Sequence, residues 1–126
     1  MIWLAVAIGG ALGSVLRYAV GLAMQRASVD FPYGTLTINV SGSLVLGFLM
    51  RFLLATTASP ELRAALTIGV CGGYTTFSTF SYEIAALMEG GHVGRAATYA
   101  VLSTVLSVAA TFAGFAFARV ALDGFR

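Results

Sequence analysis

The sequence predicts an all-α membrane protein with four transmembrane helices. Of its 126 residues, 59% are hydrophobic and 10% are charged, whereas soluble domains average about 45–50% and 25%. A helix needs about 20 apolar residues to cross a hydrocarbon core of about 30 Å, and four segments are long enough. They are approximately Ile2–Met24, Tyr33–Phe52, Leu62–Leu87 and Arg95–Val120. We therefore treat residues 1–126 as one four-span domain.

The segments are separated by turn and charge signals. Asp30 and Pro32 follow the first segment. Ser59-Pro60-Glu61 has the pattern of a helix start, with an N-cap, a first-turn proline and an acid favoured by the helix dipole. Glu89 to His92 forms a link before the fourth segment. Because the first segment lacks the basic lead and small-residue cleavage site of a signal peptide, we expect it to be retained.

The composition argues against several functions. A net charge of +2, without lysine and with scattered arginines, does not indicate a nucleic-acid partner. The single cysteine, Cys71, cannot form an internal disulfide and is expected to be a small buried side chain. No metal-ligand cluster, no nucleophile with a base and no phosphate-binding glycine loop stands out. We expect neither an enzyme nor an organic cofactor.

The arginines give only a weak preference for one orientation in the membrane. With four spans, both chain ends lie on one side, and four arginines fall on that side against two on the other. The four are Arg51, Arg63, Arg119 and Arg126, and the two are Arg26 and Arg95. A weak bias suggests the hypothesis that the chain inserts both ways and forms an antiparallel pair.

The stretch from Gly69 to Glu83 is unusual for an apolar helix. It lies largely in an uncharged run, and after the pair Gly72-Gly73 it places five hydroxyl residues within seven positions. Glycine weakens a helix, Ser and Thr compete for backbone hydrogen bonds, and in lipid each freed backbone group needs a partner inside the protein. We expect something polar to bind there.

Two other polar residues interrupt the spans. Asn39 lies in the middle of the second segment, where it either forms a buried interhelical hydrogen bond or lines a pore as a donor. Arg17 lies deep in the first segment, where it either anchors the helix at the interface or places a positive charge at an aqueous vestibule.

Hydroxyl and aromatic residues recur at helical spacing in the third and fourth segments. Phe77 with Phe80, and Thr76 with Thr79, are three residues apart and share a face; the aromatic pair is either core packing or a source of electropositive ring edges. A hydroxyl stripe at four-residue intervals predicts a polar track along the last helix. Its members are Tyr99, Ser103, Ser107 and Thr111. Glu83 either ends a polar pathway or lies at the interface.

Small residues also recur at four-residue spacing, which lets helices approach closely in lipid. The pairs are Gly9 with Gly13, Gly10 with Ser14, Ser43 with Gly47, and Ala110 with Gly114. We interpret them as packing positions.

Three motifs together resemble the Fluc (CrcB) fluoride channels. They are the segment from Gly9 to Tyr18 with Arg17, the segment Gly34 to Asn39, and Gly72-Gly73-Tyr-Thr75-Thr-Phe77-Ser-Thr-Phe80. The third motif is the most specific, and the resemblance extends over the whole chain. It implies a fluoride-selective channel for passive efflux across a prokaryotic plasma membrane, built as an antiparallel dual-topology homodimer with two pores along the subunit interface.

The resemblance also implies roles for individual residues. Asn39, the ring edges of Phe77 and Phe80, and the stripe from Tyr99 to Thr111 would line the anion pore. The third helix would be broken near Gly72–Thr75, where the backbone carbonyls of Gly72 and Thr75 from both subunits would hold a structural sodium ion. Arg17 matches the family's first-helix arginine, and Glu83 matches its acid after the aromatic motif. Together with Thr76 and Thr79, these two residues are expected to belong to a vestibule or to the polar track.

Two other functions are compatible with a small, apolar four-span chain. A small four-helix multidrug exporter would carry an acid within the membrane to exchange protons for a cationic drug, but the first span holds Arg17 and no acid. A structural membrane protein without a selective site would not need hydroxyls concentrated in two spans. Both fit the sequence less well than a channel.

Overall fold

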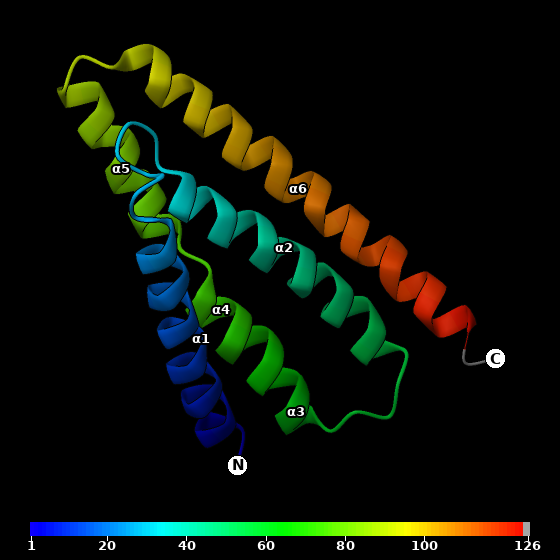
Figure 1. The fold of residues 1–126 in the computed structure, drawn as a ribbon. Coiled ribbons are helices and arrows are strands. Elements are labelled where there is room, and N and C mark those ends of the chain that lie inside the picture. Colours follow the sequence, from blue (N-terminus) through cyan, green and yellow to red (C-terminus); the bar gives the residue numbers. More distant parts are fainter. Residues whose placement is uncertain (125–126) are drawn as a thin grey trace.

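The computed structural model describes residues 1–124, and every regular element in this range is helical (Figure 1). Three helices are long and apolar enough to cross a membrane, namely α1, α2 and α6. The elements are α1 (Ile2–Met24), α2 (Tyr33–Leu54), α3 (Pro60–Ala64), the π-helical turn η1 (Ala65–Cys71), α4 (Gly72–Tyr74), α5 (Phe77–Glu89) and α6 (Val93–Asp123). Arg126, counted above among the arginines near the chain ends, lies outside the described residues.

The third predicted segment is a broken helix. Its first part runs without interruption through α3, η1 and α4, and the chain is then extended at Thr75 (φ −76°, ψ 158°) and Thr76 (φ −150°, ψ 115°) before α5 begins. The break therefore lies at the last residue of the predicted Gly72–Thr75 stretch and one residue beyond it. Gly72 to Tyr74 remain helical, because the Thr75 amide still donates to the Cys71 carbonyl at 3.0 Å.

The helices pack as two parallel pairs, α1 beside η1 and α4, and α2 beside α6 (Figure 1). Glycines permit both contacts. A Cβ at Gly9 would lie 2.3 Å from the Ala65 carbonyl oxygen, and one at Gly114 would lie 2.3 Å from the Leu44 carbonyl oxygen. The predicted use of small residues for close packing is confirmed at these positions.

Both ends of the described chain lie at one end of the molecule, together with the loop between α2 and α3 (Figure 1). The other two loops lie at the opposite end. There Arg95 Nη1 donates to the Asp30 carbonyl at 3.2 Å, which ties these two loops together. This placement of chain ends and loops agrees with the predicted division of the arginines between two sides, with Arg51, Arg63 and Arg119 toward the chain ends and Arg26 and Arg95 toward the opposite end.

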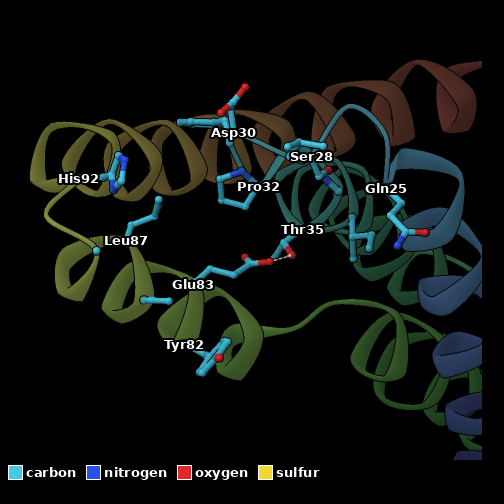
Figure 2. Close-up of a pocket in the computed structure, with 16 residues that line it drawn as sticks. Gln25, Ser28, Asp30, Pro32, Thr35, Tyr82, Glu83, Leu87 and His92 are labelled. Atoms are coloured by element: carbon cyan, nitrogen blue, oxygen red, sulfur yellow. Dashed lines mark hydrogen bonds between the residues drawn. The ribbon is translucent and has the colours of Figure 1, made fainter.

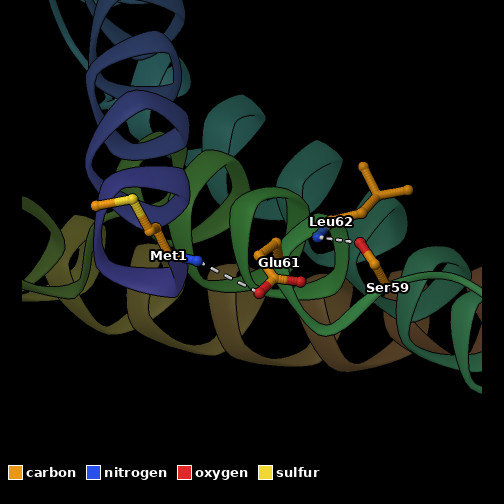
Figure 3. A network of polar contacts seen from close by, with 4 residues as sticks. All are labelled: Met1, Ser59, Glu61 and Leu62. Carbon is orange, nitrogen blue, oxygen red and sulfur yellow. Dashed lines mark hydrogen bonds and ion pairs between the residues drawn. The ribbon is translucent and has the colours of Figure 1, made fainter.

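The start of α3 has the predicted cap (Figure 3). Ser59 Oγ accepts a hydrogen bond from the Leu62 amide at 3.2 Å, and Pro60 occupies the first helical position. The Glu61 carboxylate lies 3.4 Å from the Met1 ammonium nitrogen. A backbone amide, followed by this ammonium, lowers the pKa of Glu61.

Candidate functional site

Asn39 holds the break in the third helix. Its Oδ1 accepts the Thr76 amide at 2.8 Å, and its Nδ2 donates to the Thr76 carbonyl at 3.0 Å. The two bonds fix the orientation of the amide, since a flipped side chain would face donor with donor. In a continuous helix the Thr76 amide would donate to the Gly72 carbonyl. Here it donates to Asn39 instead, so the helical hydrogen-bond pattern stops at this residue. The interhelical hydrogen bond considered for Asn39 is present, and one Nδ2 hydrogen remains for another acceptor.

Side chains from two other helices hold the residues just before Thr76. Arg17 Nη1 donates to the Thr75 carbonyl at 3.3 Å, so this guanidinium lies at the break. The Tyr74 hydroxyl lies 2.9 Å from Ser41 Oγ. A Cβ at Gly42 would lie 2.3 Å from Thr75 Cγ2, which shows how closely the break packs on α2. The extended residues are therefore fixed by α1 and α2.

A cavity of about 320 Å³ lies beside the break, between α2, α5 and α6. It brings together five residues that the sequence predicts for an anion pore, and none of its described lining residues is charged. The five are Asn39, Phe77, Phe80, Ser103 and Ser107. Thr75 and Thr76 also reach this cavity.

Ser103 contributes an unpaired hydroxyl to this cavity. The residue is 4% exposed, and its Oγ atom has no hydrogen-bond partner among residues 1–124. Buried hydroxyls are nearly always hydrogen-bonded, because leaving one unpaired costs free energy. The Ser103 hydroxyl is thus a buried donor without a partner among the described residues, next to this cavity.

The two phenylalanines of the third motif contact each other at the same cavity. Their ring centroids are 5.6 Å apart with planes at 44°, and Phe80 also packs on Tyr99 at 5.2 Å. Phe77 is 79% exposed in the single chain. Phe80 is thus held by packing, whereas Phe77 lies on an uncovered face.

Glu83 belongs to a second cavity, of about 590 Å³, beneath the loops that join α1 to α2 and α5 to α6 (Figure 2). Its carboxylate accepts hydrogen bonds from Thr35 Oγ1 at 2.8 Å and from the Tyr99 hydroxyl at 2.6 Å. Tyr99 is fully buried, with its ring against Phe31 and Phe80. Tyr99 therefore lines neither cavity but contacts one lining residue of each, Glu83 of the larger cavity and Phe80 of the cavity at the break.

The other predicted residues have separate positions. Thr111 Oγ1 donates to the Ser107 carbonyl at 3.0 Å and does not line either of these cavities. Thr76 Oγ1 donates to Thr79 Oγ1 at 3.0 Å and caps α5. Gly72 is exposed, and a Cβ there would meet no atom within 4 Å.

The four hydroxyls of α6 do not form one continuous line of free donors, because Tyr99 donates to Glu83 and Thr111 donates to the Ser107 carbonyl.

Two further polar residues of the site, Thr35 and Ser43, were not predicted from the sequence. Thr35 binds Glu83, and Ser43 lines the cavity at the break and offers its carbonyl to Thr111 Oγ1 at 3.5 Å. With Asn39 they form a polar stripe at four-residue intervals along α2, similar to the stripe on α6. This four-residue spacing along α2 is the sequence signal that could have identified both residues.

The fold and the site define a class: a small multi-pass helical membrane protein with an uncharged, hydroxyl- and aromatic-lined cavity at a helix break, suited to moving a small solute or ion. Residues 4–115 match the family described as CrcB-like protein, Camphor Resistance (CrcB). The chain belongs to this family.

Three relatives show how closely the family members agree. The chain is 54% identical to a fluoride-specific ion channel FluC of Rhizobium meliloti, over 92% of this chain and 94% of the relative. It is 47% identical to one of Agrobacterium fabrum, over 90% and 93%. It is 46% identical to one of Thermus thermophilus, over 90% and 91%. These relatives are named as ion channels, which form a non-enzyme family, and the chain is a multi-pass membrane protein of this bacterial family.

Proposed function

We propose that the chain is a fluoride-selective channel that lets fluoride leave the cytoplasm passively. The observation that carries this proposal is the unpaired Ser103 hydroxyl in the same cavity as the free Nδ2 hydrogen of Asn39 and the Phe80 ring. Fluoride gives up bound water on entry and needs small donors in return. Amide and hydroxyl hydrogens supply them, and electropositive ring edges add weaker attraction.

The absence of charge among the described residues of this cavity also fits conduction. An ion must bind well enough to enter and weakly enough to leave. A fixed positive charge in a dry site would hold fluoride strongly. Neutral donors give a shallower site, which is suited to fast passage down a gradient.

The pores are proposed to lie between two antiparallel copies of the chain. Support comes from the uncovered face around the break, where Phe77, Ser78 and Thr79 are exposed. Hydroxyls facing hydrocarbon are unfavourable unless another helix covers them. A second copy would cover this face and close the open side of the cavity.

A structural sodium ion is proposed at the centre of this dimer, held by the carbonyls of Gly72 and Thr75. The residues fit such an ion: the Gly72 carbonyl loses the Thr76 amide to Asn39, and the surroundings of Gly72 are open. The Thr75 carbonyl accepts Arg17 but retains a second lone pair. Carbonyl oxygens suit a hard monovalent cation, which would hold the two breaks together.

Ion efflux from liposomes tests the function. Purified protein is expected to release fluoride, followed with a fluoride electrode, without matching release of chloride. Phe80→Ile, which removes a ring edge from the cavity, should slow fluoride release strongly. Phe112→Ile, at a position on α6 that is 65% exposed, is the matched control and should conduct normally. Equal release of chloride, or release of neither ion, contradicts the proposal.

Sodium is tested separately by replacing it with N-methylglucamine during purification and reconstitution. The dimer should become less stable to dilution and heat. A dimer whose stability and flux are the same without sodium would contradict the sodium site while leaving fluoride conduction intact.

A further inference from the structure

A third cavity, of about 320 Å³, lies between the end of α2 and the start of the broken helix. It shares no lining residue with the cavity at the break. Its walls are mainly apolar and include Leu49, Leu53, Ala64 and Ile68. The polar members are Arg63 and Thr67, and Thr67 Oγ1 already donates to the Arg63 carbonyl at 2.8 Å. Arg63 is therefore the group available to bind an occupant.

The guanidinium of Arg63 is incompletely paired. Its Nη2 donates to the Thr56 carbonyl at 3.0 Å, but its Nε is buried without an acceptor among residues 1–124. Arg63 also forms no ion pair within the described chain. The acid closest in sequence, Glu61, is directed to the Met1 ammonium instead (Figure 3). A positive charge with unused donors thus borders an apolar cavity.

The cavity lies where a lipid headgroup would meet the protein. Arg63 is the fourth residue of the five-residue α3, and the loop that joins α3 to α2 lies at the end of the molecule (Figure 1). Arg51, in the last turn of α2, lies at the same end. From this end the apolar walls continue inward to Ile68 in η1, which is 63% exposed. An amphiphile with an anionic head and an apolar tail matches this order of groups.

We propose that this cavity is a binding site for an anionic phospholipid. The phosphate accepts hydrogen bonds from Arg63, and an acyl chain lies along Leu53 and Ile68. A phosphate offers the planar guanidinium several acceptors at once and can bind the guanidinium edge that borders the cavity, whereas Nε itself is enclosed by protein in this structure. A headgroup such as choline brings its own positive charge next to Arg63, so the site favours an anionic lipid.

Native mass spectrometry of the full-length protein tests this proposal. Protein is reconstituted in mixed phosphatidylcholine and phosphatidylglycerol vesicles, extracted in mild detergent, and examined for retained lipid. Wild type is expected to retain phosphatidylglycerol in preference to phosphatidylcholine. Arg63→Gln should lose this retained lipid several-fold, whereas Arg63→Lys should keep part of it. Arg51→Gln is the matched control at the same end and should behave as wild type.

A second variant tests the apolar part of the site without changing charge. Ile68→Trp fills the cavity and should displace the lipid while Arg63 is intact, which covers the case in which Arg63→Gln fails to fold. The proposal is overturned if both variants retain phosphatidylglycerol as wild type does. It is also overturned if wild type retains both lipids equally. Cross-linking of a Leu54→Cys variant to a second copy, with no retained lipid in wild type, would assign the cavity to the partner subunit instead.

Discussion

The Ser103 hydroxyl leads to a prediction that separates stability from conduction. A buried hydroxyl without a partner costs about 1–3 kcal/mol, so Ser103→Ala should leave the thermal stability unchanged or raise it. The same change removes a donor from the cavity at the break and should slow fluoride release. Thermal unfolding in detergent and electrode-based efflux measure the two effects on one sample.

Ser81→Ala is the matched control for Ser103→Ala. Ser81 lies on the exposed side of α5, does not line the cavity, and donates to the Phe77 carbonyl at 2.9 Å. Its removal should leave conduction unchanged. If Ser103→Ala conducts at the wild-type rate, Ser103 does not contact the ion.

Asn39→Asp should reduce fluoride flux by at least about tenfold, which corresponds to about 1.4 kcal/mol of barrier. The carboxylate can still accept the Thr76 amide, but its other oxygen would face the Thr76 carbonyl at the place where Nδ2 now donates. It also places a negative charge beside the cavity. Flux is measured in liposomes, with gel-filtration profiles to verify assembly. Wild-type flux in this variant would remove Asn39 from the conduction pathway.

At the residue scale, the sequence predicted the polar positions better than their partners. The spacing from Tyr99 to Thr111 correctly placed hydroxyls on one face of α6. Only Ser103 and Ser107 reach the cavity at the break, because Tyr99 donates to Glu83 and Thr111 donates to a backbone carbonyl. A hydroxyl rotates to the best acceptor nearby, and the acceptors belong to other helices that local spacing does not reveal.

At the element scale, the helix pairs depend on glycines that allow backbone contact. A Cβ at Gly114 would meet the Leu44 carbonyl oxygen at 2.3 Å and the Phe48 amide nitrogen at 2.7 Å. Backbone atoms cannot rotate away, so Gly114→Ala should separate α2 from α6 and cost about 1–3 kcal/mol, as overpacking does. Thermal unfolding in detergent measures this loss.

Gly94→Ala is the control for this prediction. Gly94 is also in α6, but a Cβ there would meet nothing within 4 Å. Gly94 is the second residue of α6, where alanine restricts the unfolded chain more than glycine does and adds no clash, so this variant should unfold at the same or a higher temperature. If Gly114→Ala and Gly94→Ala were equally stable, α2 and α6 would be able to move apart at this contact with little cost in free energy.

The exact position of the break could not be predicted from the sequence of the third helix alone. Local propensity pointed to Gly72 and Gly73, because glycine is a poor helix former. The helix nevertheless continues to Tyr74 and ends where Asn39 offers Thr76 both a donor and an acceptor. This competing contact joins residues 37 positions apart. The sequence predicted a break in this region, but its exact residues depended on packing.

At the scale of the whole molecule, hydropathy correctly predicted an all-helical chain, and three of the four predicted spans are continuous helices long enough to cross a membrane, whereas the third is a broken helix. The first span coincides with α1, and the predicted start of the second coincides with that of α2. The bounds of the others differ by a few residues, since helix ends depend on caps and on neighbouring loops. The pairing of α1 with η1 and of α2 with α6 was not predicted, because small residues show that helices can approach but not which ones do.

The antiparallel dimer requires the chain to insert in both orientations, and the few arginines at each end are consistent with this. Labelling from outside intact cells tests it, in a background where the buried Cys71 is replaced by alanine. Two single-cysteine variants serve as labelling positions. Thr57, changed to cysteine in one, lies in an exposed loop at the end of the molecule that holds Met1, and Ala27, changed in the other, lies in an exposed loop at the opposite end. With dual insertion, an impermeant maleimide should label about half of the copies at each position.

A single orientation gives a different pattern: one position is labelled almost completely and the other is protected. The reagent's access is verified by permeabilising the cells, which should allow both positions to react fully. Complete labelling at one end alone would exclude the antiparallel dimer, and with it the proposed placement of two pores and a sodium ion on its interface.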